Sequence, residues 1–221
     1  MTATIDGPRR AAASGTTKSL VVLLHGYGAD GNDLFGLAEP LSQILPDSAF
    51  VSPNAPQRCA NNPFGYQWFP IPWLDGSSEA ARDAGFAAAD EALNSFLDAE
   101  LTRHGLDESA VALVGFSQGT MMSLHVGPRR ATALAGIVGF SGRLLVPERL
   151  PAEIASRPPV LLVHGDQDEM VPVDDIHAAR EGLAAAEVPV RWHISPGIGH
   201  GIAPDGLQLA ASFLRERLGT L

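Results

Sequence analysis

Residues 111–120 read Val-Ala-Leu-Val-Gly-Phe-Ser-Gln-Gly-Thr, and this stretch decides the fold. An apolar run typical of a buried strand leads directly into Gly-x-Ser-x-Gly, and a helical pattern follows. Such a strand–turn–helix unit holds a serine hydroxyl clear of the backbone on a turn so tight that only small neighbours fit, here Gly115 and Gly119. Because Gly-x-Ser-x-Gly also occurs by chance in loops, interpreting Ser117 as a nucleophile requires an acid and a histidine further along the chain.

The length and composition limit the classes of protein to which this chain can belong. A chain of 221 residues can bury a sheet on both faces but is too short for two ordinary domains, so we expect a single domain over residues 1–221. The net charge of −10, without any run of Lys or Arg, argues against a nucleic-acid partner. Cys59 is the single cysteine, which excludes an intrachain disulfide. Residues 1–19 lack the apolar core of a signal peptide and no apolar run is long enough to span a membrane, so we expect a cytoplasmic protein without membrane insertion.

Apolar runs that break into polar or glycine-rich loops alternate with stretches of helical period. Continuous apolar runs are typical of strands buried on both faces of a parallel sheet. We expect strands at residues 20–24, 49–51, 111–114, 134–140, 159–163 and 190–194. We expect helices at residues 32–45, capped by Asn32, and at 79–104, 172–186 and 207–218. The alternation predicts an α/β fold with a mostly parallel central sheet and helices on both faces.

Polar side chains that follow the later strands supply the acid and the histidine. Asp166 and Asp168 both come directly after the strand at 159–163. We expect one of them to orient an imidazole and the other to hold the loop through backbone hydrogen bonds. His200 lies in a glycine-rich loop after the last strand, where it is free to reach Ser117. The order Ser, Asp, His along the chain fits a catalytic triad on such a sheet.

Backbone amides near Ser117 are candidates for binding the negative charge that forms during acyl transfer. The loop at residues 25–31 is rich in glycine, which lets its backbone approach another group closely. The amides of Tyr27 in this loop and of Gln118 at the start of the helix are the expected oxyanion hole. We expect His25 to brace the loop by hydrogen bonds rather than to act in catalysis.

Residues 57–78 form a stretch without a sustained helical or strand period, in which aromatic residues and prolines are frequent. Long ordered loops of this kind often carry function. We interpret the stretch as one wall of an acyl pocket, with ordinary surface packing as the alternative. The residues expected to line the pocket are Trp68, Phe69, Ile71 and Trp73.

Four motifs resemble the phospholipase/carboxylesterase family of α/β-hydrolases, which includes the acyl-protein thioesterases and small bacterial carboxylesterases. They are LHGYG at 24–28, GFSQG at 115–119, HGDQD at 164–168 with Val-Pro at 171–172, and GHGI at 199–202. The resemblance spans residues 20–218. It implies an α/β-hydrolase fold with Ser117 as nucleophile, Asp168 as the acid, His200 as the base, and the amides of Tyr27 and Gln118 as oxyanion hole. Many relatives have two aromatics followed by an acidic residue where this chain has Trp68-Phe69-Pro70, which predicts a different pocket wall.

These parts together indicate a serine carboxylesterase that works through an acyl-enzyme and needs neither metal nor cofactor. The compact, proline-restricted wall and the lack of a long uninterrupted apolar stretch favour short to medium acyl esters. The alternatives are a lysophospholipase or acyl-protein thioesterase acting on long acyl chains and, in another class, a non-catalytic ligand-binding α/β-hydrolase. The intact triad argues against the last. We expect a small-molecule ester as the partner, and a monomer or homodimer.

Overall fold

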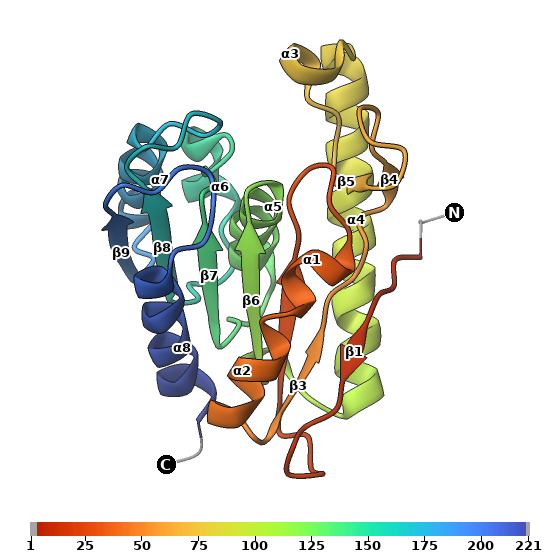
Figure 1. The fold of residues 1–221 in the computed structure, drawn as a ribbon, viewed down its shortest axis with the longest axis vertical. Coiled ribbons are helices and arrows are strands. Elements are labelled where there is room, and N and C mark those ends of the chain that lie inside the picture. The colour runs from red at the N-terminus through yellow and green to blue at the C-terminus, as the bar shows by residue number, and fades with distance from the viewer. Residues whose placement is uncertain (1–3, 220–221) are drawn as a thin grey trace.

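A seven-stranded sheet forms the centre of residues 4–219, the part of the chain that this computed structural model describes (Figure 1). The strand order is β1-β3-β2-β6-β7-β8-β9. All pairs in it are parallel except β1 with β3. The strands are β1 (Arg9–Arg10), β2 (Ser19–Leu24), β3 (Ser48–Val51), β6 (Val111–Phe116), β7 (Gly136–Phe140), β8 (Val160–Gly165) and β9 (Val190–Ser195). The prediction of an α/β fold with a mostly parallel central sheet is confirmed.

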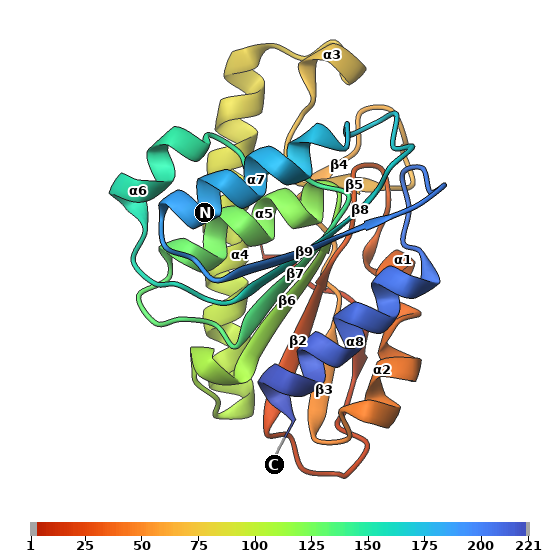
Figure 2. The same ribbon diagram turned by 90° about the vertical axis from the view of Figure 1, so that its left-hand side faces the viewer.

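Helices cover both faces of this sheet, as expected (Figure 2). One face carries α4 (Glu79–His104), α5 (Gln118–Val126), α6 (Leu150–Glu153) and α7 (Asp174–Ala185). The other carries α1 (Gly31–Phe35), α2 (Ala38–Ile44) and α8 (Pro204–Leu218). Successive side chains of a strand point to opposite faces, so β2 contributes Leu20, Val22 and Leu24 to the first core, and Val21 and Leu23 to the second. Burial on both faces explains why these strands are continuous apolar runs.

The helix predicted at residues 32–45 is two helices, and Asn32 does not cap it. The carboxylate of Asp30 caps α1 instead, accepting a hydrogen bond from the Asn32 amide at 2.8 Å. The chain then bends between α1 and α2, while Leu34 and Leu41 stay buried against the sheet. The leucine spacing therefore predicted the buried face correctly but did not reveal the break.

Residues 57–78, in which the sequence shows no sustained period, and the connection after β7 both contain short elements. Residues 57–78 hold a hairpin of β4 (Gln57–Arg58) and β5 (Tyr66–Gln67), followed by α3 (Pro72–Asp75). The connection after β7 holds the 3₁₀ turn η3 (Pro147–Arg149) and α6. Each element is one turn or a two-residue pair, too short to produce a visible period in the sequence. The remaining 3₁₀ turns are η1 (Glu108–Ala110) and η2 (Gly127–Arg129).

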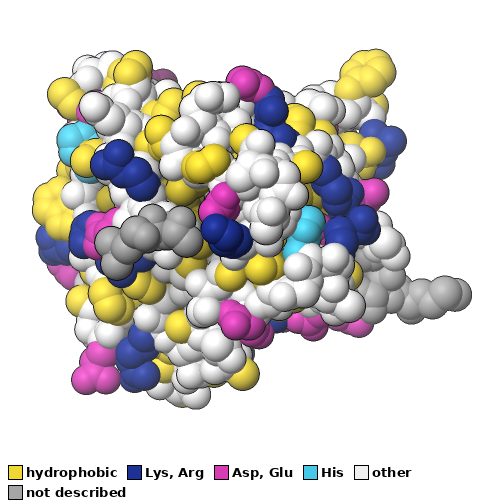
Figure 3. All heavy atoms as spheres, turned by 90° about the horizontal axis from the view of Figure 1, so that it is seen from below, with side chains coloured by type: hydrophobic (Ala, Val, Ile, Leu, Met, Phe, Trp, Pro, Cys, Tyr) yellow, Lys and Arg dark blue, Asp and Glu magenta, His cyan; other side chains and the backbone are white. Residues whose placement is uncertain are grey.

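The carboxyl ends of the parallel strands meet at one edge of the sheet, below α3 in the view of Figure 1. Leu24 pairs with Gly115, and Gly165 pairs with Ser195, so the loops that follow these strands emerge together. Ligand sites of parallel sheets lie at this edge. Figure 3 shows the molecule from below, at the end away from these loops, where acidic, basic and apolar side chains are interspersed. Within residues 4–219 no helix is both long and apolar enough to cross a membrane.

Candidate active site

Ser117 lies on the sharp turn between β6 and α5, with φ 53° and ψ −115°. The two flanking glycines are required by close backbone contacts. A Cβ on Gly115 would lie 2.4 Å from the backbone carbon of Gly119, and a Cβ on Gly119 would lie 1.8 Å from the Leu24 carbonyl oxygen. Side chains cannot be accommodated at such distances. The glycines of the motif therefore let strand, turn and helix approach each other closely enough to form the elbow.

A buried carboxylate holds the candidate base. His200 Nδ1 lies 2.8 Å from Asp168 Oδ2, and the Asp168 side chain is 0% exposed. The other oxygen of Asp168 accepts hydrogen bonds from the amides of Met170 and Val171, each at 2.9 Å. Burial raises the pKa of the Asp168 carboxyl, but hydrogen bonds from the Val171 amide and His200 outweigh it, so the pKa lies below its ordinary value. An ionised Asp168 favours the tautomer with the proton on His200 Nδ1, which leaves Nε2 as an acceptor.

Asp166, the other aspartate of this loop, contacts backbone. Its Oδ1 accepts a hydrogen bond from the Gly197 amide at 2.6 Å. Gly197 lies three residues before His200 in the same loop. The structure thus brings Asp168 to the imidazole, whereas Asp166 fixes the loop that carries it.

Ser117 and His200 face one pocket of about 420 Å³. The Ser117 hydroxyl and His200 Nε2 have no hydrogen-bond partner within residues 4–219, although both residues line this pocket. Serine–histidine contacts are often loose before a substrate binds. The ring of Phe116, which precedes the serine, lies 4.9 Å from the His200 imidazole and restricts where that ring can move. The volume is within the usual range for small-molecule sites.

Two backbone amides beside the serine are available to an anion. The Tyr27 amide donates no hydrogen bond within the described residues 4–219. Gln118 is the first residue of α5, and the first amides of a helix have no intrahelical acceptor. Tyr27 and Gln118 both line the same pocket as Ser117. A carbonyl oxygen bound next to the serine can therefore meet two donors and the positive end of a helix.

Comparison with known proteins identifies the family. The sequence profile of the family described as Phospholipase/Carboxylesterase matches residues 8–218. The chain belongs to this family. It is accordingly a serine hydrolase of the α/β-hydrolase type, which confirms the resemblance noted from its motifs.

Three proteins illustrate the similarity, which extends over most of each chain. Acyl-protein thioesterase 1 of Gibberella zeae is 29% identical over 212 residues, covering 90% of each chain. Esterase YpfH of Escherichia coli is 27% identical over 203 residues, covering 90% of this chain and 82% of its own. The solved structure of esterase PE8 is 49% identical and superposes with a TM-score of 0.92, covering 97% of this chain and 100% of that one.

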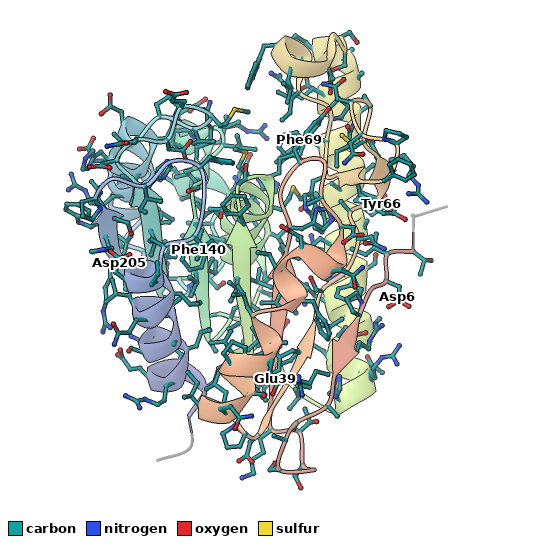
Figure 4. The ribbon with its side chains drawn as sticks, viewed as in Figure 1. Asp6, Glu39, Tyr66, Phe69, Phe140 and Asp205 are labelled. Carbon is teal, nitrogen blue, oxygen red and sulfur yellow. The ribbon has the colours of Figure 1, made fainter. Side chains whose placement is uncertain are left out.

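The pocket wall of this family member contains three of the four residues predicted for it. Phe69, Ile71 and Trp73 line the pocket, and Figure 4 shows Phe69 below α3. The prediction for Trp68 is wrong, because its side chain is 0% exposed and lies in the core. The Trp68 indole donates to the His25 carbonyl at 3.0 Å.

The side chain of Gln118 explains why Trp68 lies in the core while Phe69 lines the pocket. Its oxygen accepts a hydrogen bond from the Trp68 amide at 3.0 Å, and its nitrogen donates to the Phe69 carbonyl at 2.8 Å. This pair of bonds fixes the backbone so that one ring enters the core and the next faces the pocket. Aromatic density in the sequence could not separate the two rings.

Two further histidines brace strand ends, and for His25 this is the expected role. His25 Nδ1 lies 2.7 Å from the Gly26 carbonyl oxygen, and its Nε2 accepts a hydrogen bond from the Ala55 amide at 3.0 Å. Burial holds the pKa of the His25 imidazole below its ordinary value. His164 Nε2 lies 2.8 Å from the Val171 carbonyl oxygen. Both side chains are buried, and neither lines the pocket that Ser117 faces.

Sequence reasoning missed several pocket residues. The apolar ones include Met121, Leu145, Met170 and Val171, and the charged ones are Asp33, Glu79, Arg82 and Arg143. Met121 lies one helical turn after Ser117, and Met170 follows closely after Asp168, so proximity to the triad was an available signal for these two. The charged residues come from α1, α4 and the loop after β7, and no sequence pattern connects those segments.

Proposed function

We propose that the chain is a serine carboxylesterase that hydrolyses short to medium acyl esters through an acyl-enzyme intermediate. The observation that carries this proposal is that Ser117 on its elbow and His200 bonded to a buried Asp168 open into one pocket. The similarity to esterase PE8 over nearly the whole chain supports an ester as the substrate. A single catalytic domain and a cytoplasmic location, inferred from the sequence, belong to the same proposal.

Acylation follows from the positions of these groups. His200 Nε2 takes the proton of the Ser117 hydroxyl while the oxygen attacks the ester carbonyl carbon, and Asp168 stabilises the imidazolium that forms. The carbonyl oxygen becomes an anion and accepts hydrogen bonds from the amides of Tyr27 and Gln118. Each such donor contributes about 3 kcal/mol to lowering the barrier. His200 then gives the proton to the alcohol oxygen, which leaves while the acyl group stays on Ser117.

Deacylation uses the same groups. His200 takes a proton from a water molecule, and the hydroxide attacks the acyl-enzyme carbonyl. The second oxyanion accepts hydrogen bonds from the same two amides. When it collapses, the Ser117 oxygen leaves, recovers the proton from His200, and the carboxylic acid is released. The bonds made and broken in both halves are balanced by protein side chains and water alone.

The lining of the pocket supports the assignment of acyl length. The pocket lining combines the apolar side chains of Phe69, Ile71 and Leu145 with four charged ones, namely Asp33, Glu79, Arg82 and Arg143. A long apolar chain extending past these groups would desolvate them without replacing their hydrogen bonds, which is costly. The second candidate is a thioesterase or lysophospholipase for long acyl chains, which the similarity to acyl-protein thioesterase 1 favours.

Replacing the candidate nucleophile tests the enzymatic proposal. We expect Ser117→Ala to abolish hydrolysis of a chromogenic short-chain ester and to prevent covalent labelling by a fluorophosphonate, measured by intact-protein mass. Ser123→Ala is the matched control, because Ser123 is a buried serine on the same helix whose hydroxyl bonds the Gly119 carbonyl. Hydrolysis retained by Ser117→Ala would refute the mechanism, and a wild-type chain without esterase activity would support the non-catalytic alternative.

A series of esters from acetyl to palmitoyl tests the substrate class. We expect kcat/KM to peak at short or medium chains and Trp73→Ala to lower it for medium chains while sparing acetyl esters. Trp73 is 72% exposed, so its removal leaves the core intact. Phe64→Ala is the matched control, since Phe64 is 85% exposed in the same wall segment and does not line the pocket. A rate that rises steadily to palmitoyl would favour the long-chain candidate.

A further inference from the structure

The loop that carries the Tyr27 amide is held by the pocket-wall segment. The Gly28 amide donates to the Tyr66 carbonyl at 2.8 Å, and the Tyr66 amide donates to the Ala29 carbonyl at 2.7 Å. The Asn62 side chain donates to the Gly28 carbonyl at 2.8 Å. These bonds fix residues 28 and 29 to the β4–β5 hairpin. The peptide group that contains the Tyr27 amide is held at its carbonyl end, where the Gly26 oxygen accepts hydrogen bonds from His25 Nδ1 at 2.7 Å and from the Ala29 amide at 3.3 Å.

The side chain of Tyr27 makes a separate connection, to α3. Its hydroxyl donates to Asp75 Oδ2 at 3.1 Å. The same carboxylate accepts hydrogen bonds from the Ile71 amide at 2.8 Å and the Ser77 amide at 2.9 Å, one on each side of α3. Asp75 therefore joins both ends of this short helix to the ring of Tyr27.

The ionisation of both groups favours this bond at neutral pH. Burial raises the pKa of the Asp75 carboxyl, but the hydrogen bonds from Ser77, Ile71 and Tyr27 outweigh it and leave the pKa below its ordinary value. Burial and the neighbouring Cys59 and Asp75 hold the pKa of the Tyr27 phenol above its ordinary value. A neutral phenol thus donates to a carboxylate, and hydrogen bonds to charged groups are stronger than neutral ones.

We propose that the Tyr27–Asp75 hydrogen bond, together with the bonds to the Gly26 carbonyl, sets the position of the Tyr27 amide in the oxyanion hole, which makes Asp75 a positioning residue for ester hydrolysis. The inference rests on the proposed function, in which this amide binds the oxyanion. Oxyanion donors act only within a narrow distance range, and a shift far from the reacting atoms can lower the rate strongly. Trp73 and Leu74 of α3 line the pocket, so one bond joins the wall that faces the acyl group to the amide that faces its carbonyl.

The Tyr27→Phe variant removes only the hydroxyl and keeps the ring. We expect kcat for an acetyl ester to fall about tenfold with little change in KM, because the lost geometry matters in the transition state and not in ground-state binding. The inhibition constant of a trifluoromethyl ketone, whose adduct with the serine places an oxyanion in the hole, should rise by the same factor. Tyr66→Phe is the matched control, since the chain has two tyrosines and Tyr66 lies outside the pocket lining.

A purely structural role for the bond predicts a different result. Tyr27→Phe would then lower the melting temperature while kcat and the inhibition constant stayed within twofold of the wild type, and this outcome would overturn the proposal. If Tyr27→Phe does not fold, Asp75→Asn provides the second variant, with the same expected loss in kcat and in inhibitor affinity. Loss of activity in Ser117→Ala together with an unchanged Tyr27→Phe would reject the positioning role alone, whereas activity in Ser117→Ala would reject the proposed function as well.

Discussion

Two hydrogen-bonded histidine–aspartate pairs lie near β9, and only one of them belongs to the pocket. His200 Nδ1 lies 2.8 Å from Asp168 Oδ2, and His193 Nε2 lies 2.7 Å from Asp205 Oδ2. A serine is close to the second pair too, since the Ser195 hydroxyl donates to Asp205 Oδ1 at 3.0 Å. By residue type and by distance, the two groups therefore look alike.

Burial and connectivity separate the two pairs. The Asp168 side chain is 0% exposed, whereas that of Asp205 is 44% exposed on the outer side of the sheet (Figure 4). In the second group the serine bonds the carboxylate instead of facing the free nitrogen of the imidazole, so it has no base to activate it. A serine, a histidine and an aspartate in contact thus do not make a catalytic site. A catalytic site also needs the pocket, the elbow that presents the serine, and a histidine that lies between the aspartate and the serine.

The largest expected effect comes from replacing the two carboxylates in turn. We expect Asp168→Asn to lower kcat by about 10³- to 10⁴-fold, because the amide favours the wrong tautomer of His200. Asp205→Asn should change kcat less than about twofold, since its partner His193 does not reach the pocket. Steady-state kinetics on one short-chain ester measure both. Comparable losses in the two variants would show that burial does not distinguish the pairs.

His125 is a third histidine near a carboxylate, but it makes no hydrogen bond to that carboxylate. His125 Nε2 lies 3.6 Å from Asp90 Oδ1. Burial, and then the positive charge of Arg129, lower the pKa of His125 to about 4. Since the unfolded imidazole has a higher pKa, the unfolded chain binds more protons between that value and about 4, and folding stability falls as pH drops through this window. We expect His125→Leu to lose about 2 kcal/mol less unfolding free energy than the wild type when the pH falls through this window. Urea unfolding at several pH values measures the difference. An unchanged pH dependence would contradict it.

The smallest expected effect comes from the loop aspartate next to the triad. Asp166→Asn weakens the bond to the Gly197 amide but leaves an oxygen that can still accept it. We expect a loss of about 1 kcal/mol in unfolding free energy and a change in kcat below about threefold. Thermal unfolding and kinetics on the same preparations check both values. A loss in kcat larger than that of Asp168→Asn would exchange the roles assigned to the two aspartates.

The sequence predicted the parts of this molecule that depend on local pattern. The apolar runs gave the parallel strands, and the glycines around Ser117 mark contacts between backbones that only glycine allows. The elements that it missed depend on distant partners. Strand β1 consists of Arg9 and Arg10 pairing with β3, and two residues cannot show an alternation. The burial of Trp68 likewise depends on the Gln118 side chain, which is 50 residues away along the chain.

The backbone conformation that the nucleophile Ser117 needs for activity lowers the stability of the fold. Its φ of 53° with a ψ of −115° lies outside the favoured regions for a residue with a side chain, and such a conformation stores about 1–3 kcal/mol of strain. Ala at this position removes the hydroxyl but keeps the Cβ and hence the strain, whereas Gly removes both. An inactive Ser117→Gly chain is therefore expected to unfold at a higher temperature than the active enzyme, so that selection for stability alone would act against the nucleophile.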